Sequence, residues 1–489
     1  MGRMPAKRQS GENKRLRAPA VSTGVILSGI AVAALGVIGL SSEGPEVIFR
    51  TAAICVGVSL ATATAIEATA GIRNLIRVDL LMLWILYLLT LMEFLFPQPG
   101  VDSALSAVAA TNGTIAVLLG FAGLVVGRHL VPWRSGSHYN SPFANVPPSK
   151  FFLLLIASAF LGYLHMFLAV NFDPFEVFRQ MLMPRFTQAW SRGRYGGDIF
   201  SLLVEVGTLI YLIPPIAGLI YARPKDYTSA QKFIVGAVLL FTLFYGFASG
   251  TRNIIGTYVI TFFGAYYLNK PRVTLKHALC LGIPALLVLL LGSAFMLKFR
   301  TSGLTDFSFD PSQLETLSVD YNLITISKLT EIFPSEFDYL GLEIPYHALI
   351  HPIPRMLWPG KPEGLSVSVE TALGADAATV TLASSFVGEA YIAGGLVGVL
   401  IAAVLFGAAA ELWNRLGRAV TSPFAQLLYA SGFFCAMLSM RSITWASVTT
   451  LPTIALWLYG KLFLKKRGRA TPVGSATSVR TGTAGQKPF

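Results

Sequence analysis

Charged residues are scarce in this sequence, and their scarcity sets the class of the protein. Only 13% of the 489 residues are Asp, Glu, Lys or Arg, whereas 54% are hydrophobic. Soluble domains carry about 25% charged residues. Hydrophobic segments of bilayer-spanning length recur along the chain, and backbone groups inside lipid must be satisfied within helices or closed barrels. The composition therefore predicts an all-α polytopic membrane protein.

Cysteine and the common catalytic motifs are also nearly absent. The three cysteines, Cys55, Cys280 and Cys435, lie inside hydrophobic segments and imply neither a disulfide framework nor a metal cluster. The sequence contains no Walker loop, HExxH motif, paired CxxC or serine nucleophile elbow. We therefore expect no metal site, no cofactor and no direct use of ATP. The first hydrophobic segment has the length of a span and no clear cleavage site, so we expect no cleaved signal peptide.

The hydrophobic segments predict about twelve transmembrane helices. They cover residues 20–41, 47–70, 80–97, 103–127, 151–170, 200–221, 231–249, 253–269, 277–297, 383–409, 424–441 and 446–463. Together they form a single transmembrane domain over 19–467. The basic leader 1–18 and the tail 468–489 are polar, and we expect both to be disordered.

Basic residues between the segments indicate the topology. An even number of spans puts both termini on one side, and both termini are basic, so both are expected in the cytoplasm. The even-numbered connections then also lie inside, and each of them is basic: Arg73 and Arg77; Arg128, Arg134 and Lys150; Arg223, Lys225 and Lys232; Lys270, Arg272 and Lys276; Arg415 and Arg418. The net charge of +13 is accordingly interpreted as cytoplasmic loops facing anionic lipid, and no nucleic acid partner is expected.

Two large loops fall on the exoplasmic side, at 171–199 and 298–382. Both carry apolar residues at helical spacing, such as Leu314 and Leu317 in one and Phe175 and Phe178 in the other, so we expect short amphipathic helices in each. Contrary to the usual trend, this side is rich in cations. They include Arg185, Arg194, Arg252, Arg300, Arg355, Lys361 and Arg441. Guanidinium groups gathered at a membrane surface are suited to a lipid phosphate or pyrophosphate.

The segment 347–362, HALIHPIPRMLWPGKP, is the most unusual part of the longer loop. Its four prolines prevent a regular helix and fix an irregular path, which would hold Arg355, Lys361 and Trp358 in place. His347 or His351 could accept a proton from a hydroxyl group, because imidazole titrates near neutral pH. A hydrogen-bonded structural role is an equal alternative for each histidine.

Acidic residues within the predicted spans are few. Glu389 lies one or two turns into the tenth span, close to Tyr391, and needs a cationic partner such as an outer arginine. A purely structural Arg–Glu pair is the alternative. The other ionisable residues within spans lie near predicted span ends, where we expect them to reach water: Glu67, Glu93, His165 and Glu205.

Three stretches together resemble a known family. They are Gly250-Thr251-Arg252 at the start of a span, the segment 353–362 (IPRMLWPGKP), and Gly388-Glu389 followed by Tyr391 and paired glycines. These resemble the Wzy-type oligosaccharide repeat-unit polymerases, the O-antigen polymerase group of bacterial inner membranes. The family usually continues its third stretch with Asn and Phe, and this chain does not. The resemblance is best over residues 245–400.

The resemblance implies a membrane glycosyltransferase of the multi-span C-type class, related to O-antigen ligases. The implied donor and acceptor are glycans linked to undecaprenyl pyrophosphate, joined at the exoplasmic face of the inner membrane. Arginines would bind the leaving pyrophosphate, and Glu389 or a histidine would orient or deprotonate the attacking hydroxyl. The sequence does not decide whether a chain-length regulator is a further partner.

Two other functions remain open. An O-antigen ligase would use the same donor with a different acceptor, and the sequence separates the two enzymes poorly. A twelve-span secondary transporter would be expected to have two matching halves, often with a long central cytoplasmic loop. Here the long loops are on the predicted outer side and are unequally placed, which favours the transferase.

Overall fold

The computed structural model describes residues 20–98, 100–131, 146–190, 199–249, 252–270, 282, 303–304, 321–362, 365–366, 369–374, 383–419 and 422–464. Over these residues the chain is helical and contains no β-strand. The prediction of an all-α protein is confirmed for this part of the chain. Arg194, Arg300, most of the expected span 277–297 and both terminal segments lie outside the described residues.

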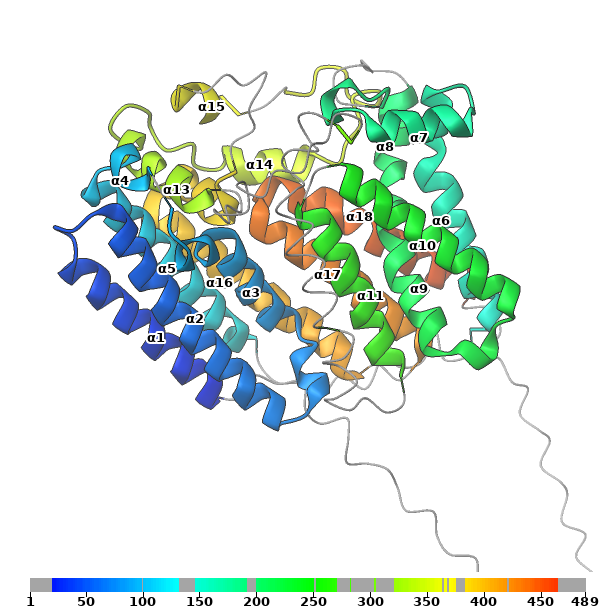
Figure 1. Cartoon of the computed structure of the whole chain (residues 1–489), viewed down its shortest axis with the longest axis horizontal. Helices are drawn as coiled ribbons and strands as arrows, with labels where there is room; N and C mark the ends of the chain where they lie inside the picture. The colour runs from blue at the N-terminus through cyan, green and yellow to red at the C-terminus, as the bar shows by residue number, and fades with distance from the viewer. Residues whose placement is uncertain are drawn as a thin grey trace, which may run out of the picture.

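One group of helices is built from the first part of the chain and a long late helix. It contains α1 (Ala20–Gly39), α2 (Pro45–Thr69), α3 (Val78–Thr90) and α5 (Ala107–Leu130), with α16 (Ser385–Ala419) packed along α5. In Figure 1 these helices lie side by side on the left of the molecule. Small residues allow close packing: a Cβ on Gly127 of α5 would collide with the Val404 carbonyl oxygen of α16.

A second group is built from the middle of the chain and its end. It contains α6 (Pro148–Ala169), α9 (Ile213–Ala222), α10 (Ser229–Ala248), α11 (Arg252–Asn269), α17 (Pro423–Arg441) and α18 (Ile443–Tyr459). Aromatic rings fill its core, and those of Tyr211 and Phe434 stack with their centroids 3.7 Å apart. α17 also packs against α3 and α16, so it connects this group to the first.

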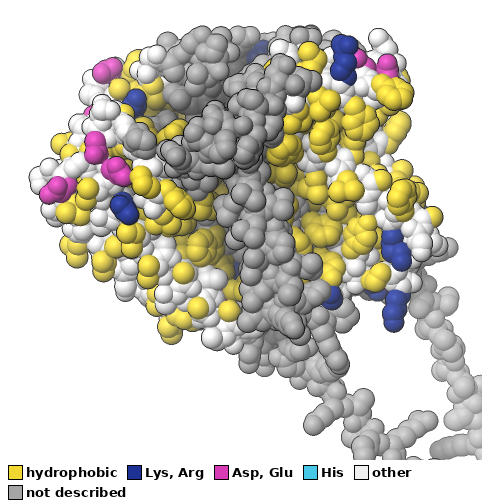
Figure 2. Space-filling model, in the orientation of Figure 1, with side chains coloured by type: hydrophobic (Ala, Val, Ile, Leu, Met, Phe, Trp, Pro, Cys, Tyr) yellow, Lys and Arg dark blue, Asp and Glu magenta, His cyan; other side chains and the backbone are white. Residues whose placement is uncertain are grey.

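Within the described residues, eight helices are long and apolar enough to cross a membrane, as expected for a multi-pass membrane protein. They are α1, α2, α5, α6, Leu202–Ala222, α10, α16 and α17. Helices α3, α11 and α18 lie at three further expected positions but are not among these eight. Figure 2 shows hydrophobic side chains over most of the visible flanks, with acidic side chains confined to the upper and left margins.

Short helices occupy the two large loops. α7 (Pro174–Leu182) and the 3-10 turn η4 (Arg185–Thr187) lie in the first loop, and α8 (Ile199–Val206) follows it. α13 (Asn322–Ile332), α14 (Glu343–Ile350) and α15 (Val369–Ala372) lie in the second. All except η4 are labelled along the upper edge of Figure 1. The apolar spacing that predicts a helix in the second loop includes Leu314 and Leu317, which lie outside the described residues. The described helix α13 begins at Asn322, directly after Tyr321, which adopts a left-handed conformation with φ 52°.

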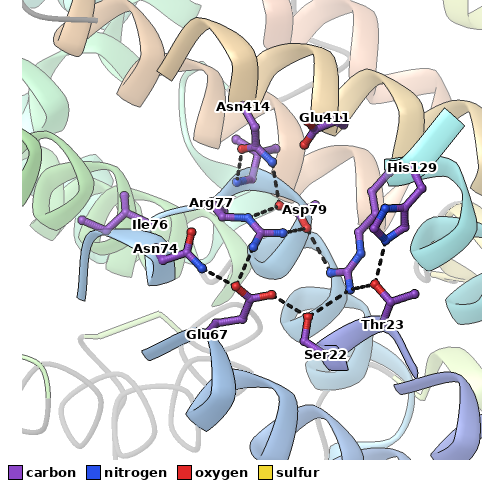
Figure 3. Close-up of polar contacts among 12 residues, drawn as sticks. Ser22, Thr23, Glu67, Asn74, Ile76, Arg77, Asp79, His129, Glu411 and Asn414 are labelled. Atoms are coloured by element: carbon purple, nitrogen blue, oxygen red, sulfur yellow. Dashed lines mark hydrogen bonds and ion pairs between the residues drawn. The ribbon is translucent and has the colours of Figure 1, made fainter. Parts of the chain in front are cut away.

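A buried group of four charges ties the first helix group together, and Figure 3 shows it in close-up. We call Glu67, Arg77, Asp79 and Arg128 the ionic cluster; each is at most 3% exposed. Arg77 donates through Nη1 to Glu67 at 2.7 Å and through Nε to Asp79 Oδ1 at 3.0 Å. Arg128 donates to Asp79 Oδ2 at 3.1 Å. Two carboxylates and two guanidinium groups therefore neutralise one another inside the protein.

Neutral polar groups complete the hydrogen bonds of the cluster. The Ser22 hydroxyl of α1 donates to Glu67 at 2.6 Å, and the Asn414 amide of α16 donates to Asp79 at 2.6 Å. Asn414 in turn accepts from the backbone N–H of Val78 and from the Tyr429 hydroxyl, both at 2.9 Å. The cluster thus reaches residues of α1, α2, α3, α5, α16 and α17.

The burial of this cluster and of two other ionisable residues corrects two interpretations of the sequence. Glu67, Glu93 and His165 were expected to reach water, but they are only 1%, 0% and 8% exposed, because neighbouring helices and turns cover these span ends. Arg77 and Arg128 were counted as cations of inside loops that face lipid. They are instead paired in the interior, so their presence has a structural reason independent of membrane topology.

Candidate functional site

The candidate site is organised around the first turn of α18. Like every helix, α18 begins with backbone N–H groups that have no partner within the helix. The Glu389 carboxylate of α16 accepts two of them through Oε2, from Ile443 at 2.6 Å and Thr444 at 3.3 Å. The Ser442 hydroxyl accepts from Trp445 N at 3.4 Å. An acidic side chain is favoured at this position because the helix dipole is positive at its N-terminus.

Two further predicted residues meet this turn. Arg441 is the last residue of α17 and acts electrostatically on Glu389. The His351 ring follows α14 and lies edge-on to the Trp445 ring, with centroids 6.1 Å apart. We call Glu389, Arg441, Ser442, Trp445 and His351 the Glu389 site. It joins three elements that are distant in sequence: the start of α16, the α17–α18 junction and the end of α14.

The proline-rich segment folds back on itself beside His351. The Lys361 ammonium donates to the carbonyl oxygens of His351 at 2.9 Å and Ile353 at 3.0 Å. Arg355 Nη1 donates to the Lys361 carbonyl at 3.2 Å. Partial burial lowers the pKa of Lys361, and the neighbouring Arg355 lowers it further, while Glu205 of α8 opposes the shift. The segment therefore holds two cations in a fixed loop within electrostatic range of α8.

A break in α16 fixes the orientation of the half-helix that carries Glu389. Gly394 and Gly395 leave helical geometry, and Gly395 has φ 60°. The carbonyl groups released at the break are satisfied by the chain before α14: Leu340 N donates to Ile392 O at 3.0 Å and Gly341 N to Ala393 O at 2.9 Å. Irregular backbone is tolerated near a membrane when protein satisfies it in this way. The break thus links the Glu389 half-helix to α14.

The structure brings some predicted site residues together and separates others. Glu389, Arg441 and His351 meet at the Glu389 site. Lys361 adjoins it through the His351 carbonyl, and Arg355 contacts the Lys361 carbonyl. Tyr391 is 8% exposed, and its ring lies edge-on to that of Tyr339 with centroids 6.2 Å apart. His347 Nε2 lies 3.9 Å from the Glu343 carboxylate. Trp358 is half-buried within the proline-rich segment. Arg185 lies in η4 and acts electrostatically on Tyr245 of α10.

Arg252 was expected to be a principal phosphate ligand. Its backbone begins α11, a helix at the position of an expected span. Its side chain, like Arg194 and Arg300, is outside the described part of the structure. The described residues contain no group of three or more His, Cys, Asp or Glu that could hold a metal ion.

Sequence reasoning missed Ser442, Trp445 and Glu205. Ser442 alone separates α17 from α18, and serine is a preferred residue at the start of a helix. The sequence therefore did contain a signal for Ser442: two helices that meet at a single residue, next to the charged Arg441. Glu205 could not have been found, because its relation to Lys361 depends on how distant loops pack.

Residues 322–420 match a domain of unknown function, DUF8712. This range runs from α13 through α14 and the proline-rich segment to the end of α16. It therefore contains Glu389, His351, Arg355 and Lys361. No curated protein and no solved structure matches the chain.

Proposed function

We propose that the chain is a polymerase of lipid-linked oligosaccharide repeat units, a glycosyltransferase acting at the exoplasmic face of the bacterial inner membrane. The observation that carries the proposal is the Glu389 site with its neighbours Lys361 and Arg355. One carboxylate and several cations are held at one end of an apolar helix bundle. Asn414, which donates to the ionic cluster, lies near the other end of α16, 25 residues after Glu389. The resemblance at 353–362 and 388–391 supplies the sugar chemistry, and both stretches fall within the matched domain.

The cations would act on the leaving group. In the proposed reaction the acceptor hydroxyl attacks the anomeric carbon of the donor glycan, and the bond between that carbon and the pyrophosphate oxygen breaks. Lys361 uses two of its three N–H donors on the carbonyl oxygens of His351 and Ile353, which aims the ammonium without neutralising it. Arg355 and Arg441 add positive charge, and such preorganised charge stabilises a departing pyrophosphate.

The proton of the acceptor hydroxyl must also leave. Glu389 is the first candidate base, since Oε2 is anchored on two N–H groups of α18 and the carboxylate orientation is therefore fixed. His351 lies against the same turn and is the second candidate. The departing pyrophosphate carries the electron pair of the broken bond and stays on its polyprenyl lipid, so the reaction needs no nucleotide.

The decisive test uses purified full-length protein in lipid vesicles with polyprenyl-pyrophosphate-linked repeat units and no nucleotide. A ladder of longer lipid-linked glycans is expected. Arg355→Ala and Arg252→Ala should abolish the ladder while leaving the protein level unchanged. Arg223→Ala is the matched control, because Arg223 is a partly exposed arginine that pairs with Asp226 after α9. Normal ladders from both site variants would refute the pyrophosphate site.

The acceptor distinguishes the two lipid-linked glycan transferases. Transfer only to a lipid A–core acceptor, without a ladder, would identify an O-antigen ligase.

One observation favours a different function, a secondary transporter: helix α16 is broken, and discontinuous helices line the substrate sites of many transporters. Vesicles that accumulate an external solute against its gradient, and form no new glycosidic bond, would establish that alternative.

A further inference from the structure

Helix α7 has three distinct faces. Val177 and Met181, one turn apart, are each 1% exposed and pack into the second helix group. Glu176 and Gln180 form a polar face and are joined by a hydrogen bond of 2.8 Å. The third face is apolar and uncovered: Phe175 is 85% exposed and Phe178 is 49% exposed. A single exposed apolar side chain needs no explanation, but aligned exposed aromatic residues indicate a surface that contacts something apolar.

The position of α7 against α10 indicates which apolar surroundings its exposed face contacts. The Phe178 ring meets the Phe241 ring of α10 edge-on, with centroids 5.5 Å apart. Phe241 precedes the end of α10 at Ala248 by about 10 Å along the helix axis. α7 therefore lies beside the last third of a candidate membrane span and not beyond its end.

The exposed face of α7 continues the exposed flank of that span. On α10, Leu240 is 67% exposed next to Phe241, and Phe233 is 78% exposed two turns earlier. Figure 2 shows hydrophobic side chains covering the right-hand flank, where α10 runs in Figure 1. The flank of α10 must face acyl chains if α10 crosses the membrane, and Phe178 adjoins that flank directly.

The chain is bent to reach this position. After α6, both Asn171 and Phe172 adopt left-handed conformations, with φ 53° and 61°, and Phe172 N donates to Phe167 O at 2.7 Å. A bulky side chain such as that of Phe172 rarely adopts this conformation because its Cβ crowds the backbone. The turn directs α7 back alongside α10 instead of away from the bundle. It also leaves Phe172 57% exposed, adjoining α7.

We infer that α7 is an interfacial helix, with Phe172, Phe175 and Phe178 inserted at the boundary between headgroups and acyl chains of the adjacent leaflet. Helices with this arrangement sit about 5–10 Å into that boundary. Arg179 pairs with Glu176 through Nε at 3.0 Å. Its side chain is 70% exposed and carries its guanidinium on a flexible stem at the surface, which suits a lipid phosphate. The inference does not depend on the proposed enzymatic activity.

The inserted helix would also set the depth of the basic turn that follows it. Gln180 accepts from the backbone N–H of Ala189 at 3.0 Å, and the Leu182 carbonyl accepts from Leu304 N at 2.7 Å. These contacts attach the η4 turn, with Arg185, and a part of the second large loop to α7. Arg185 is therefore held at the level of the lipid headgroups.

Spin-label depth measurements on the full-length protein test this inference. Phe175→Cys is made in a chain whose three native cysteines are replaced by serine, labelled with a nitroxide and reconstituted in vesicles of phosphatidylethanolamine and phosphatidylglycerol. Relaxation by oxygen, which concentrates in acyl chains, should exceed relaxation by a water-soluble nickel chelate. Glu176→Cys, one residue away on the polar face, is the matched control and should show the reverse order.

Two results would overturn the inference. If the nickel chelate relaxes the labels at Phe175 and Glu176 equally well, α7 lies in water. If neither reagent reaches the Phe175 label and spins on different chains interact, a second copy of the protein covers the apolar face. Folding is checked in each sample by thermal unfolding, so a misfolded variant is recognised and replaced by Phe178→Cys.

Discussion

Single residues of the ionic cluster are expected to matter more than most residues of the apolar core. Glu67, Asp79, Arg77 and Arg128 are stable in the interior only as a set, since each carboxylate is paired and hydrogen-bonded. Removing one partner of such a set leaves an uncompensated buried charge, whereas an exposed ion pair contributes little. The cost of a substitution here is therefore set by the charge that remains.

Arg77→Ala should lower the free energy of unfolding by about 3–5 kcal/mol, because it removes the cation paired with Glu67 and leaves Asp79 paired with Arg128 alone. Arg73→Ala is the matched control: its guanidinium donates to the Lys270 carbonyl and is only partly buried, so a loss of about 1 kcal/mol is expected. Thermal unfolding of the purified proteins in detergent measures both. Equal shifts for the two variants would contradict the assigned role of the cluster.

Lys361 should give donor binding a characteristic pH dependence. Partial burial and the nearby Arg355 lower its pKa below the ordinary value of 10.5. The ammonium then loses its proton at a lower pH than a free lysine, so affinity for polyprenyl pyrophosphate should fall earlier on the alkaline side. Lys361→Arg keeps its charge and should hold affinity to higher pH. Calorimetric titrations from neutral to alkaline pH measure this, and superimposable profiles would exclude Lys361 as a phosphate contact.

Sequence reasoning selected individual candidate residues but did not predict their surroundings. It selected Glu389, His351, Arg355, Lys361 and Arg441, and the structure brings these residues into one neighbourhood. It did not foresee that Glu67 and Arg77 would be buried together. Their pairing depends on the turn between α2 and α3, and hydrophobic periodicity carries no information about such a turn.

Among the elements, α16 is distinguished by its break. Gly395 has φ 60°, and a Cβ at this position would lie 2.7 Å from the Tyr339 hydroxyl oxygen. The break is also where the chain before α14 attaches, through Leu340 and Gly341. The geometry of the Glu389 half-helix therefore depends on a glycine that lies outside the Glu389 site.

Gly395→Ala should destabilise the protein by about 1–3 kcal/mol, through backbone strain and the contact with Tyr339. Gly394→Ala is the adjacent control: Gly394 has φ −172°, and a Cβ there would meet nothing within 4 Å. Chemical denaturation in mixed micelles compares the two variants with the native chain. A Gly394 variant as unstable as the Gly395 variant would show that the break tolerates neither side chain and that Tyr339 is not the cause.

At the scale of the whole molecule, two sets of polar residues, the ionic cluster and the Glu389 site, lie at opposite ends of the helices. The ionic cluster and the Glu389 site lie near opposite ends of α16, and Arg441 and Tyr429 are correspondingly separated along α17. Positive charge in the loops predicts that the ionic cluster faces the cytoplasm. The Glu389 site would then face the opposite side.

Cysteine labelling tests this orientation in a chain whose native cysteines are replaced by serine. Ser366→Cys lies in the loop after the proline-rich segment and should react with a membrane-impermeant maleimide in intact cells. Lys225→Cys, in the exposed turn between α9 and α10, should react only after permeabilisation. The opposite pattern would invert the topology and exclude an exoplasmic active site.

Hydrophobic periodicity predicted the all-helical class and the positions of most helices in the described chain. Eleven of the twelve expected spans coincide with helices of the described chain, although only eight meet the length and composition of a span. Periodicity reports which side chains avoid water, and that signal is strong in long apolar segments. It does not report which helices are neighbours, so the packing of α16 along α5 and the meeting of α14 with α18 could not be inferred.

The ionic cluster has a consequence for how the chain is made. Its charges are synthesised in the order Glu67, Arg77, Asp79, Arg128, and Asn414 follows much later. A nascent chain that ends after α3 holds two carboxylates and one guanidinium group, and it gains its balancing charge only when Arg128 emerges at the end of α5. At the ionic cluster, helices α1 to α3 therefore carry one unbalanced negative charge during insertion. They must remain accessible to water or to the translocation machinery until α5 brings Arg128.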